Sequence, residues 1–278
     1  MEGKIPLRSE MIPRHTASKS MKSLSSQLAA ATLALAAAAA ENAPETGYDG
    51  PPEQLHIYLL IGQSNMSGRA PVTDGQKEIP PRTLLLNAAN TWEAATHPFN
   101  QYSTIRRGLR MQRLGPGYGF AAAMTAADPS VTIGLIVNAR GGSGIGEWQR
   151  GEKAYDDAVA RARAAMATGR LRGILWHQGE RNREDPDGYL ERLAELIASL
   201  RADLEAPELP FVAGQIHNLP AINDQIARLP ETVPFTRFAS SDGLSTYDRW
   251  HFDTESTVKL GKRYAEAMIN LQKEADAR

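Results

Sequence analysis

The chain alternates short apolar runs of strand length with segments of helical period, and this alternation restricts its fold more than any other feature. The apolar runs cover residues 55–61, 131–137 and 173–176, with weaker candidates at 211–216 and 235–239. Strands that alternate with helices favour a parallel sheet covered by helices on both faces. The sequence therefore predicts an α/β fold with a mostly parallel central sheet.

Helical period marks the segments between and after these runs. The expected helices are 119–127, 154–167, 189–204 and a last one that begins near Thr254. The stretch 76–111 has little period and is expected to form an irregular excursion over the site. In folds of this class, ligands bind at the carboxyl ends of the strands, so the chemistry is expected there.

The N-terminal region is typical of a secretory signal. An apolar, Ala-rich run at 28–40 follows two lysines and ends in small residues, and it is shorter than the roughly 20 residues that span a bilayer. We expect a leader and signal peptide at 1–40, a linker at 41–54 and one domain at 55–278. The protein would then be secreted or periplasmic, without stable membrane insertion. An Ala-rich linker helix and an organelle transit segment remain alternatives.

Composition excludes several classes of chemistry. The chain has no cysteine, which excludes disulfides, thiolate zinc sites and a cysteine nucleophile. Its formal net charge is -1, so the overall charge does not favour a nucleic-acid partner. A charge this close to zero fits an uncharged polysaccharide better than an anionic polymer. The oligomeric state stays open.

Polar and glycine residues follow the apolar runs directly. The first run leads into GQSNM (62–66), the second into NARGGS (138–143) and the third into HQGE (177–180). The sequence DRWH (248–251) follows the last run. A serine, an acid and a histidine are the parts of a hydroxyl nucleophile, its base and the group that orients the base.

The residues suggest a role for each group. Ser64 is the candidate nucleophile, His251 its base, and Asp248 the acid that orients the imidazole. The oxyanion formed by attack on an ester needs fixed donors. The backbone N–H of Ser64, an N–H of the turn 141–142 and the amide of Gln178 are the candidates.

Each of these groups also has a simpler explanation. Ser64 could be an ordinary helix N-cap, and 141–146 a plain turn or a phosphate loop, although it lacks the P-loop lysine. Gln178 could be a polar group satisfied at a strand end, and Asp248 could simply pair with His251 on the surface. Their joint placement at strand ends favours the catalytic interpretation.

The motifs resemble a known family. GQSNMSGR (62–69), ARGGSGIGEW (139–148), WHQGE (176–180) and DRWH (248–251) resemble the four sequence blocks of SGNH hydrolases. The resemblance runs from about Leu55 to the C-terminus and is greatest to the sialate O-acetylesterase and carbohydrate esterase family six group, which includes acetylxylan esterases. It implies a three-layer α/β/α sandwich that deacetylates acetylated carbohydrates through an acetyl-serine intermediate, with no metal or other cofactor.

The resemblance also implies site residues. It assigns Ser64 as nucleophile, His251 as base and Asp248 as orienting acid, with Glu180 as a rival for the acid role. It places the oxyanion donors on the nucleophile's own N–H, on Gly142 and on Gln178.

The walls of the substrate pocket follow from side-chain chemistry. Arg69, Trp148 and Trp250 are the expected walls, because an aromatic face packs against a pyranose ring. A core position for Trp148 is an equal alternative. The loops in 65–104 and 218–234 are expected to set the size of the pocket.

The choice of substrate stays open at this level. Arg181-Asn182 replaces the Ser-Asp that usually follows HQGE in the family, and a bulky Arg249-Trp250 separates the acid from the histidine. The acetyl group could sit on xylan, sialic acid or another glycan. A general short-chain carboxylesterase and an inactive carbohydrate-binding protein are the alternative functions.

Overall fold

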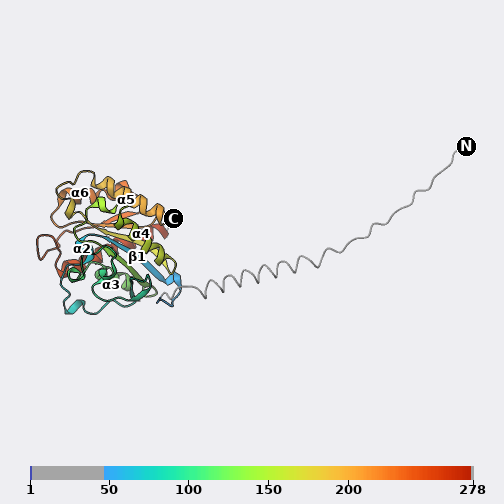
Figure 1. The fold of residues 1–278 in the computed structure, drawn as a ribbon, viewed down its shortest axis with the longest axis horizontal. Helices are drawn as coiled ribbons and strands as arrows, with labels where there is room; N and C mark the ends of the chain where they lie inside the picture. Colours follow the sequence, from blue (N-terminus) through green and yellow to red (C-terminus); the bar gives the residue numbers. More distant parts are fainter. Residues whose placement is uncertain (2–46, 277–278) are drawn as a thin grey trace. The chain divides into compact units, whose positions relative to one another are not determined.

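A seven-stranded sheet lies at the centre of the fold, with the strand order β3-β2-β4-β1-β5-β6-β7. The structure is a computed structural model that describes Met1 and residues 47–276 (Figure 1). Every neighbouring pair of strands is parallel except β2 with β3, which confirms the predicted mostly parallel sheet. The strands are β1 (Leu55–Gly62), β2 (Thr83–Leu86), β3 (Trp92–Ala94), β4 (Thr132–Ala139), β5 (Arg170–His177), β6 (Phe211–Gly214) and β7 (Thr236–Ala239).

Two of these strands lie in the stretch 76–111, where the sequence predicts only an irregular excursion. β2 runs beside β4, and β3 returns antiparallel to β2. β2 has 4 residues and β3 has 3, too few to show a period. The ring of Trp92 packs against Gly134 of β4, where a β-carbon would stand only 2.7 Å from it. The prediction is wrong here because tertiary packing, not local pattern, creates these strands.

Helices cover both faces of the sheet and complete three layers. One face carries the helices whose apolar side chains join the core around Trp176, and the opposite face carries the pair that packs around Phe120 (Figure 1). The first set is α4 (Lys153–Met166), α5 (Tyr189–Asp203), α6 (Pro220–Ala227) and α7 (Leu229–Thr232); the second is α3 (Gly117–Ala127) and α8 (Thr254–Asp276). The α/β/α sandwich is therefore confirmed.

The long helices follow the predicted ones closely, whereas the shorter ones do not. α3, α4, α5 and α8 each begin within two residues of the expected position. α6 and α7 occupy most of 218–234, which was expected to be a loop. Ile222, Ile226 and Leu229 bury their side chains in the core, so this segment is structural.

β1 occupies the middle of the sheet and brings three sequence motifs together. Gly62 at its carboxyl end pairs with Ala139 of β4 on one side and with His177 of β5 on the other. The chain leaves these three strands at the same edge. The chain builds the sheet on the β4 side of β1 first, then crosses over β1 to β5 and continues outward through β6 and β7, so this edge is a switch point of the kind where ligands bind in open α/β sheets.

The predicted leader, 1–40, lies outside the described residues apart from Met1. Within the predicted linker, Tyr48 packs against the core, and a 3-10 turn at Pro52–Gln54 leads into β1. In the part of the chain that the structure describes, no helix is both long enough and apolar enough to cross a bilayer.

Candidate active site

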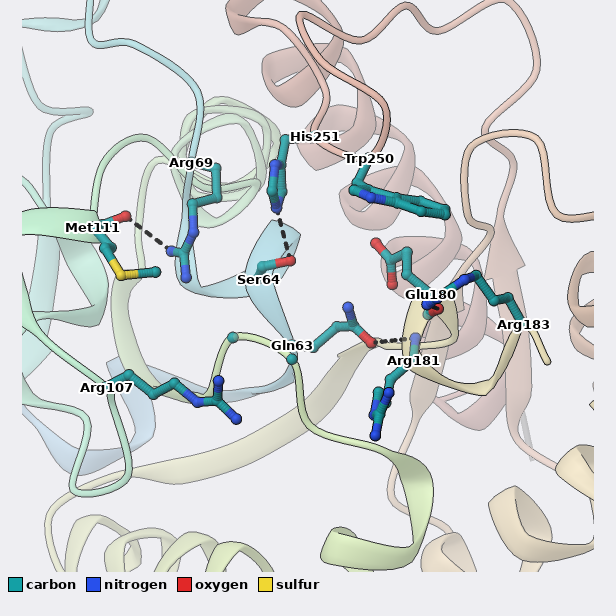
Figure 2. Close-up of a pocket in the computed structure, with 12 residues that line it drawn as sticks. Gln63, Ser64, Arg69, Arg107, Met111, Glu180, Arg181, Arg183, Trp250 and His251 are labelled. Carbon is teal, nitrogen blue, oxygen red and sulfur yellow. Dashed lines mark hydrogen bonds between the residues drawn. The ribbon is translucent and has the colours of Figure 1, made fainter. Parts of the chain in front are cut away.

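Ser64, His251 and Asp248 form a chain of hydrogen bonds at the carboxyl edge of the sheet. Ser64 Oγ lies 3.0 Å from His251 Nε2, and His251 Nδ1 lies 2.7 Å from Asp248 Oδ2 (Figure 2 draws the first of these bonds). An ionised carboxylate only accepts, so Nδ1–H is the donor to Asp248 and Nε2 keeps its lone pair for the Ser64 hydroxyl. The imidazole is therefore placed to accept the proton of the Ser64 hydroxyl, which is the arrangement that a serine nucleophile requires.

Asp248 also shapes the loop that carries the histidine. Its Oδ1 accepts hydrogen bonds from the backbone N–H groups of Trp250 and His251, both at 2.7 Å. Partial burial acts to raise the pKa of the Asp248 carboxyl, but the hydrogen bonds from the His251 ring and from the two N–H groups outweigh it and lower that pKa. One oxygen therefore fixes the loop while the other orients the imidazole.

Two residues predicted to supply oxyanion donors through their backbone N–H groups, Ser64 and Gly142, both line the pocket. Ser64 is the first residue of the short helix α2 (Ser64–Ser67), and Gly142 lies in the loop after β4. Among the described residues, neither N–H has a hydrogen-bond acceptor. Gly142 has a φ of 74°, which favours glycine, and a β-carbon on Gly141 would stand 2.5 Å from the Arg69 guanidinium. Glycines are therefore required for this loop to lie against the nucleophile.

The prediction that Gln178 donates to the oxyanion is wrong. Gln178 is fully buried, and its Nε2 bonds to Asn182 Oδ1 at 2.8 Å and to the Ser143 carbonyl at 3.1 Å. The same nitrogen lies 3.2 Å from Gln63 Oε1. The amide N–H groups are used to join loops and do not reach the pocket.

Gln63 is the residue that the sequence interpretation missed. Its Oε1 accepts from Gln178 Nε2 and lies 3.4 Å from the N–H groups of Gly179 and Arg181. These bonds hold the oxygen away from the pocket, so Nε2 faces the space beside Ser64 (Figure 2). The available signal was its position directly before the nucleophile in GQSNM.

A pocket of about 270 Å³ opens beside Ser64. Arg69 and Trp250, both predicted as walls, line it together with Met111 and several further arginines (Figure 2). Arg69 is held in place by hydrogen bonds to the Gly68 and Met111 carbonyls, at 2.8 and 2.9 Å. Among the described residues that line this pocket, none comes from 218–234, so the expected role of that segment is wrong.

Trp148 is a core residue and not a pocket wall. Its side chain is fully buried, and its ring packs edge-on against Trp176 with the centroids 5.5 Å apart. Its indole N–H donates to Ser143 Oγ at 3.0 Å, which anchors the loop after β4 from below. The expectation of sugar contact fails because the ring is needed to fill the space under this loop.

Glu180 lies in the pocket wall below the ring of Trp250 but not on the histidine (Figure 2). Its Oε1 accepts a hydrogen bond from Asn65 Nδ2 at 2.7 Å, whereas Asp248 is the acid bonded to His251. Burial raises the pKa of Glu180 to about 7, although hydrogen bonds from its own backbone N–H and from Asn65 act in the opposite direction. The geometry therefore favours Asp248 over Glu180 as the orienting acid.

The raised pKa of Glu180 predicts that the stability of the protein depends on pH. The native carboxyl keeps its proton up to about pH 7, whereas the unfolded one ionises near pH 4.5. The wild-type free energy of unfolding is therefore expected to fall by about 3 kcal/mol, relative to Glu180→Gln, between pH 4.5 and pH 8. Urea unfolding of both proteins at the two pH values measures this change. Parallel pH curves for the two proteins would contradict it.

In the described part of the chain, no group of three or more His, Asp or Glu side chains has the arrangement of a metal site. The polar groups that line the pocket are a hydroxyl, an imidazole, an amide, guanidinium groups and the carboxyl of Glu180. This set suits acyl transfer from an ester, in which the nucleophile, base and oxyanion donors are all protein groups.

The sheet, its two helical layers and the polar edge at Ser64 define the class of protein, an esterase of the SGNH hydrolase type. The sequence profile described as "Carbohydrate esterase, sialic acid-specific acetylesterase" matches residues 54–270. The chain belongs to this family of carbohydrate esterases.

Individual relatives agree with this assignment. The chain is 32% identical over 253 residues to a "probable carbohydrate esterase" of Arabidopsis thaliana, covering 83% of this chain and 95% of the relative. It is similar to the crystal structure of a protein from Arabidopsis thaliana, with a TM-score of 0.70, 28% identity, and coverage of 79% of this chain and 99% of the other. The crystal structure of NanS has the same fold, with a TM-score of 0.66, 17% identity, and coverage of 81% and 99%.

Proposed function

We propose that the protein is a serine esterase that removes O-acetyl groups from carbohydrates through an acetyl-serine intermediate. The observation that carries this proposal is the 3.0 Å contact between Ser64 Oγ and His251 Nε2 beside an open pocket. A protein that only binds carbohydrate has no use for a base on that hydroxyl. Membership of the carbohydrate esterase family supports an acetylated carbohydrate as the substrate.

The reaction has two balanced halves. Ser64 Oγ attacks the acetyl carbonyl carbon while His251 Nε2 takes the hydroxyl proton. The bond from the acetyl carbon to the sugar oxygen then breaks, and His251 gives the proton to that oxygen. Water attacks the acetyl-serine with His251 again as base, and acetate leaves as the proton returns to Ser64. Asp248 stabilises the imidazolium in both halves.

Three donors are placed to hold the negative charge that develops on the carbonyl oxygen. We assign them as the N–H of Ser64, the N–H of Gly142 and Nε2 of Gln63. Gln178 contributes indirectly, because its amide holds the oxygen of Gln63 away from the pocket. A donor held in place before the reaction costs no reorganisation when the charge forms.

Arginine side chains favour an acidic sugar over a neutral one. Arg69, Arg107, Arg181 and Arg183 all line the pocket, whose carboxyl group is the buried Glu180. Among the described residues, the guanidinium groups of Arg107 and Arg181 have no hydrogen-bonded or ion-paired partner. Guanidinium groups match the geometry of a carboxylate. The local charge therefore favours a carboxylated, O-acetylated sugar, although the net charge of -1 alone points to a neutral polysaccharide.

The substrate proposal predicts a preference that depends on Arg107. The two test substrates are an O-acetylated sialic acid and its methyl ester, which differ only in the carboxylate. In Arg107→Gln, the ratio of kcat/KM for the acid to that for the ester is expected to fall about tenfold, because one carboxylate partner is lost. Acetate release gives both values. Arg170→Gln removes the same charge from an exposed site at the opposite end of β5 and serves as the control.

Two outcomes would contradict the substrate proposal. One is a wild-type enzyme that hydrolyses the acid and its methyl ester equally well. The other is an Arg170→Gln variant that lowers the ratio as much as Arg107→Gln does, because the effect would then arise from total charge and not from the pocket.

A further inference from the structure

Asn65 connects the nucleophile to both sides of the catalytic histidine. It directly follows Ser64 in α2 and is 5% exposed. Its Nδ2 donates to the Trp250 carbonyl at 3.0 Å, and its Oδ1 accepts from the Phe252 N–H at 3.2 Å. These two backbone groups flank His251. A single amide therefore holds the loop on both sides of the histidine, next to the serine that the histidine must reach.

Glu180 fixes which way this amide points. The second N–H of Asn65 Nδ2 donates to Glu180 Oε1 at 2.7 Å, a shorter contact than either bond to the loop. If the amide were reversed, its oxygen would face both the carboxyl of Glu180 and the carbonyl of Trp250, and its N–H groups would face another N–H. The carboxyl oxygen thus selects the orientation in which all of the amide's bonds are formed.

We propose that Asn65 and Glu180 form a positioning pair, in which Glu180 orients the Asn65 amide and the amide holds His251 Nε2 against Ser64 Oγ. Glu180 then contributes to the rate through Asn65, while Asp248 remains the acid on the imidazole. The inference rests on the proposed serine mechanism and deepens it. The oxygen that accepts from Asn65 is present in either protonation state of Glu180, so the pair needs an acceptor and not a charge.

Three substitutions should weaken the pair, and one should preserve it. Asn65→Ala removes both bonds to the loop, and Asn65→Asp places a carboxylate against the Trp250 carbonyl and Glu180. Glu180→Ala leaves the amide without its orienting acceptor. Glu180→Gln keeps an acceptor oxygen at the same place. Asn270→Ala, an exposed position on α8, is the matched control for Asn65→Ala.

The experiment measures kcat and KM for 4-nitrophenyl acetate, together with the rate at which a fluorophosphonate probe labels Ser64. In Asn65→Ala, Asn65→Asp and Glu180→Ala, kcat and the labelling rate are expected to fall by about 10-fold to 100-fold, with KM changed less than about threefold. Glu180→Gln should restore kcat to within about threefold of wild type. The kcat of the double variant Asn65→Ala/Glu180→Ala should lie within about twofold of that of Asn65→Ala, because Glu180 acts through Asn65.

Several outcomes would overturn the positioning pair. They are a Glu180→Gln enzyme as slow as Glu180→Ala, losses that multiply in the double variant, or an Asn65→Ala enzyme labelled at the wild-type rate. Rates are expressed per active site titrated by the probe, so a smaller fraction of folded protein does not change the measured kcat. The comparison of Glu180→Ala with Glu180→Gln tests the role of the acceptor oxygen even if the Asn65 variants do not fold. Full activity in Ser64→Ala would instead refute the proposed function itself.

Discussion

Ser64→Ala is expected to lower kcat/KM for 4-nitrophenyl acetate by about 10⁴-fold or more, because it removes the hydroxyl that is bonded to His251 and that would form the acyl intermediate. The hydroxyl lies 3.0 Å from His251 Nε2, and Ser64 and Gly142, whose N–H groups are the proposed oxyanion donors, both line the pocket. The donors stay in place when the hydroxyl is removed. A small residual rate from them is therefore compatible with the prediction.

The same variant should not react with a fluorophosphonate probe. Intact mass measurement of the wild type should show one added phosphonyl group, and peptide mapping should place it on Ser64. Ser130→Ala, which removes an exposed hydroxyl in the turn before β4, is the matched control and should behave as wild type. A Ser64→Ala enzyme that keeps its activity or its labelling would refute the serine mechanism.

Asp248→Asn is expected to lower kcat/KM by about 10³-fold to 10⁴-fold, a loss comparable to that in other serine triads. The reason lies in the two roles of the carboxylate. One oxygen accepts from the backbone N–H groups of Trp250 and His251, and the other accepts from His251 Nδ1. In asparagine only one atom can accept. If the loop keeps it, an NH₂ group faces Nδ1, which forces the proton onto Nε2, where it blocks transfer from Ser64.

Initial rates on 4-nitrophenyl acetate measure this loss of activity. Two further variants serve as a control and as a test of the rival acid. Asp242→Asn makes the same change at an exposed residue of the neighbouring turn and is the control. Glu180→Gln tests the rival acid and is expected to lose far less, because Glu180 does not contact the imidazole. If Glu180→Gln loses as much as Asp248→Asn, the assignment of the orienting acid is wrong.

The sequence predicts the position of the site much better than the direction of its side chains. Apolar runs that end in GQSNM and HQGE indicate which strand ends carry polar groups, and parallel pairing of β1 with β4 and β5 brings them together. Whether a side chain beyond a strand end faces the pocket or the interior depends on the local backbone. Gln63 and Gln178 are both amides at such ends, and their hydrogen bonds to each other and to the neighbouring loops decide that Gln63 lines the pocket and Gln178 does not.

Differences in burial explain why the sequence interpretation placed Trp148 wrongly and Trp250 correctly. Trp148 and Trp250 are both indoles within site motifs, and nothing in the pattern distinguishes them. Trp148 is buried against Trp176, whereas the guanidinium groups of Arg183 and Arg249 contact the ring of Trp250, with their carbons 5.1 and 4.6 Å from its centroid. The neighbours that make this difference come from other parts of the chain and become apparent only when the fold is known.

The separation of Ser64 and His251 by 187 positions in sequence has a consequence for how the protein acquires activity. β1 is flanked by β4 and β5, and His251 lies in the loop directly before α8, which packs on α3. The nucleophile is therefore translated long before its base, and contacts of such long range close late in folding. A nascent chain whose loop with His251 has not yet been synthesised contains Ser64 but lacks the base that would activate it. Recovery of esterase activity during refolding should thus report completion of the whole domain and lag behind recovery of helical circular dichroism.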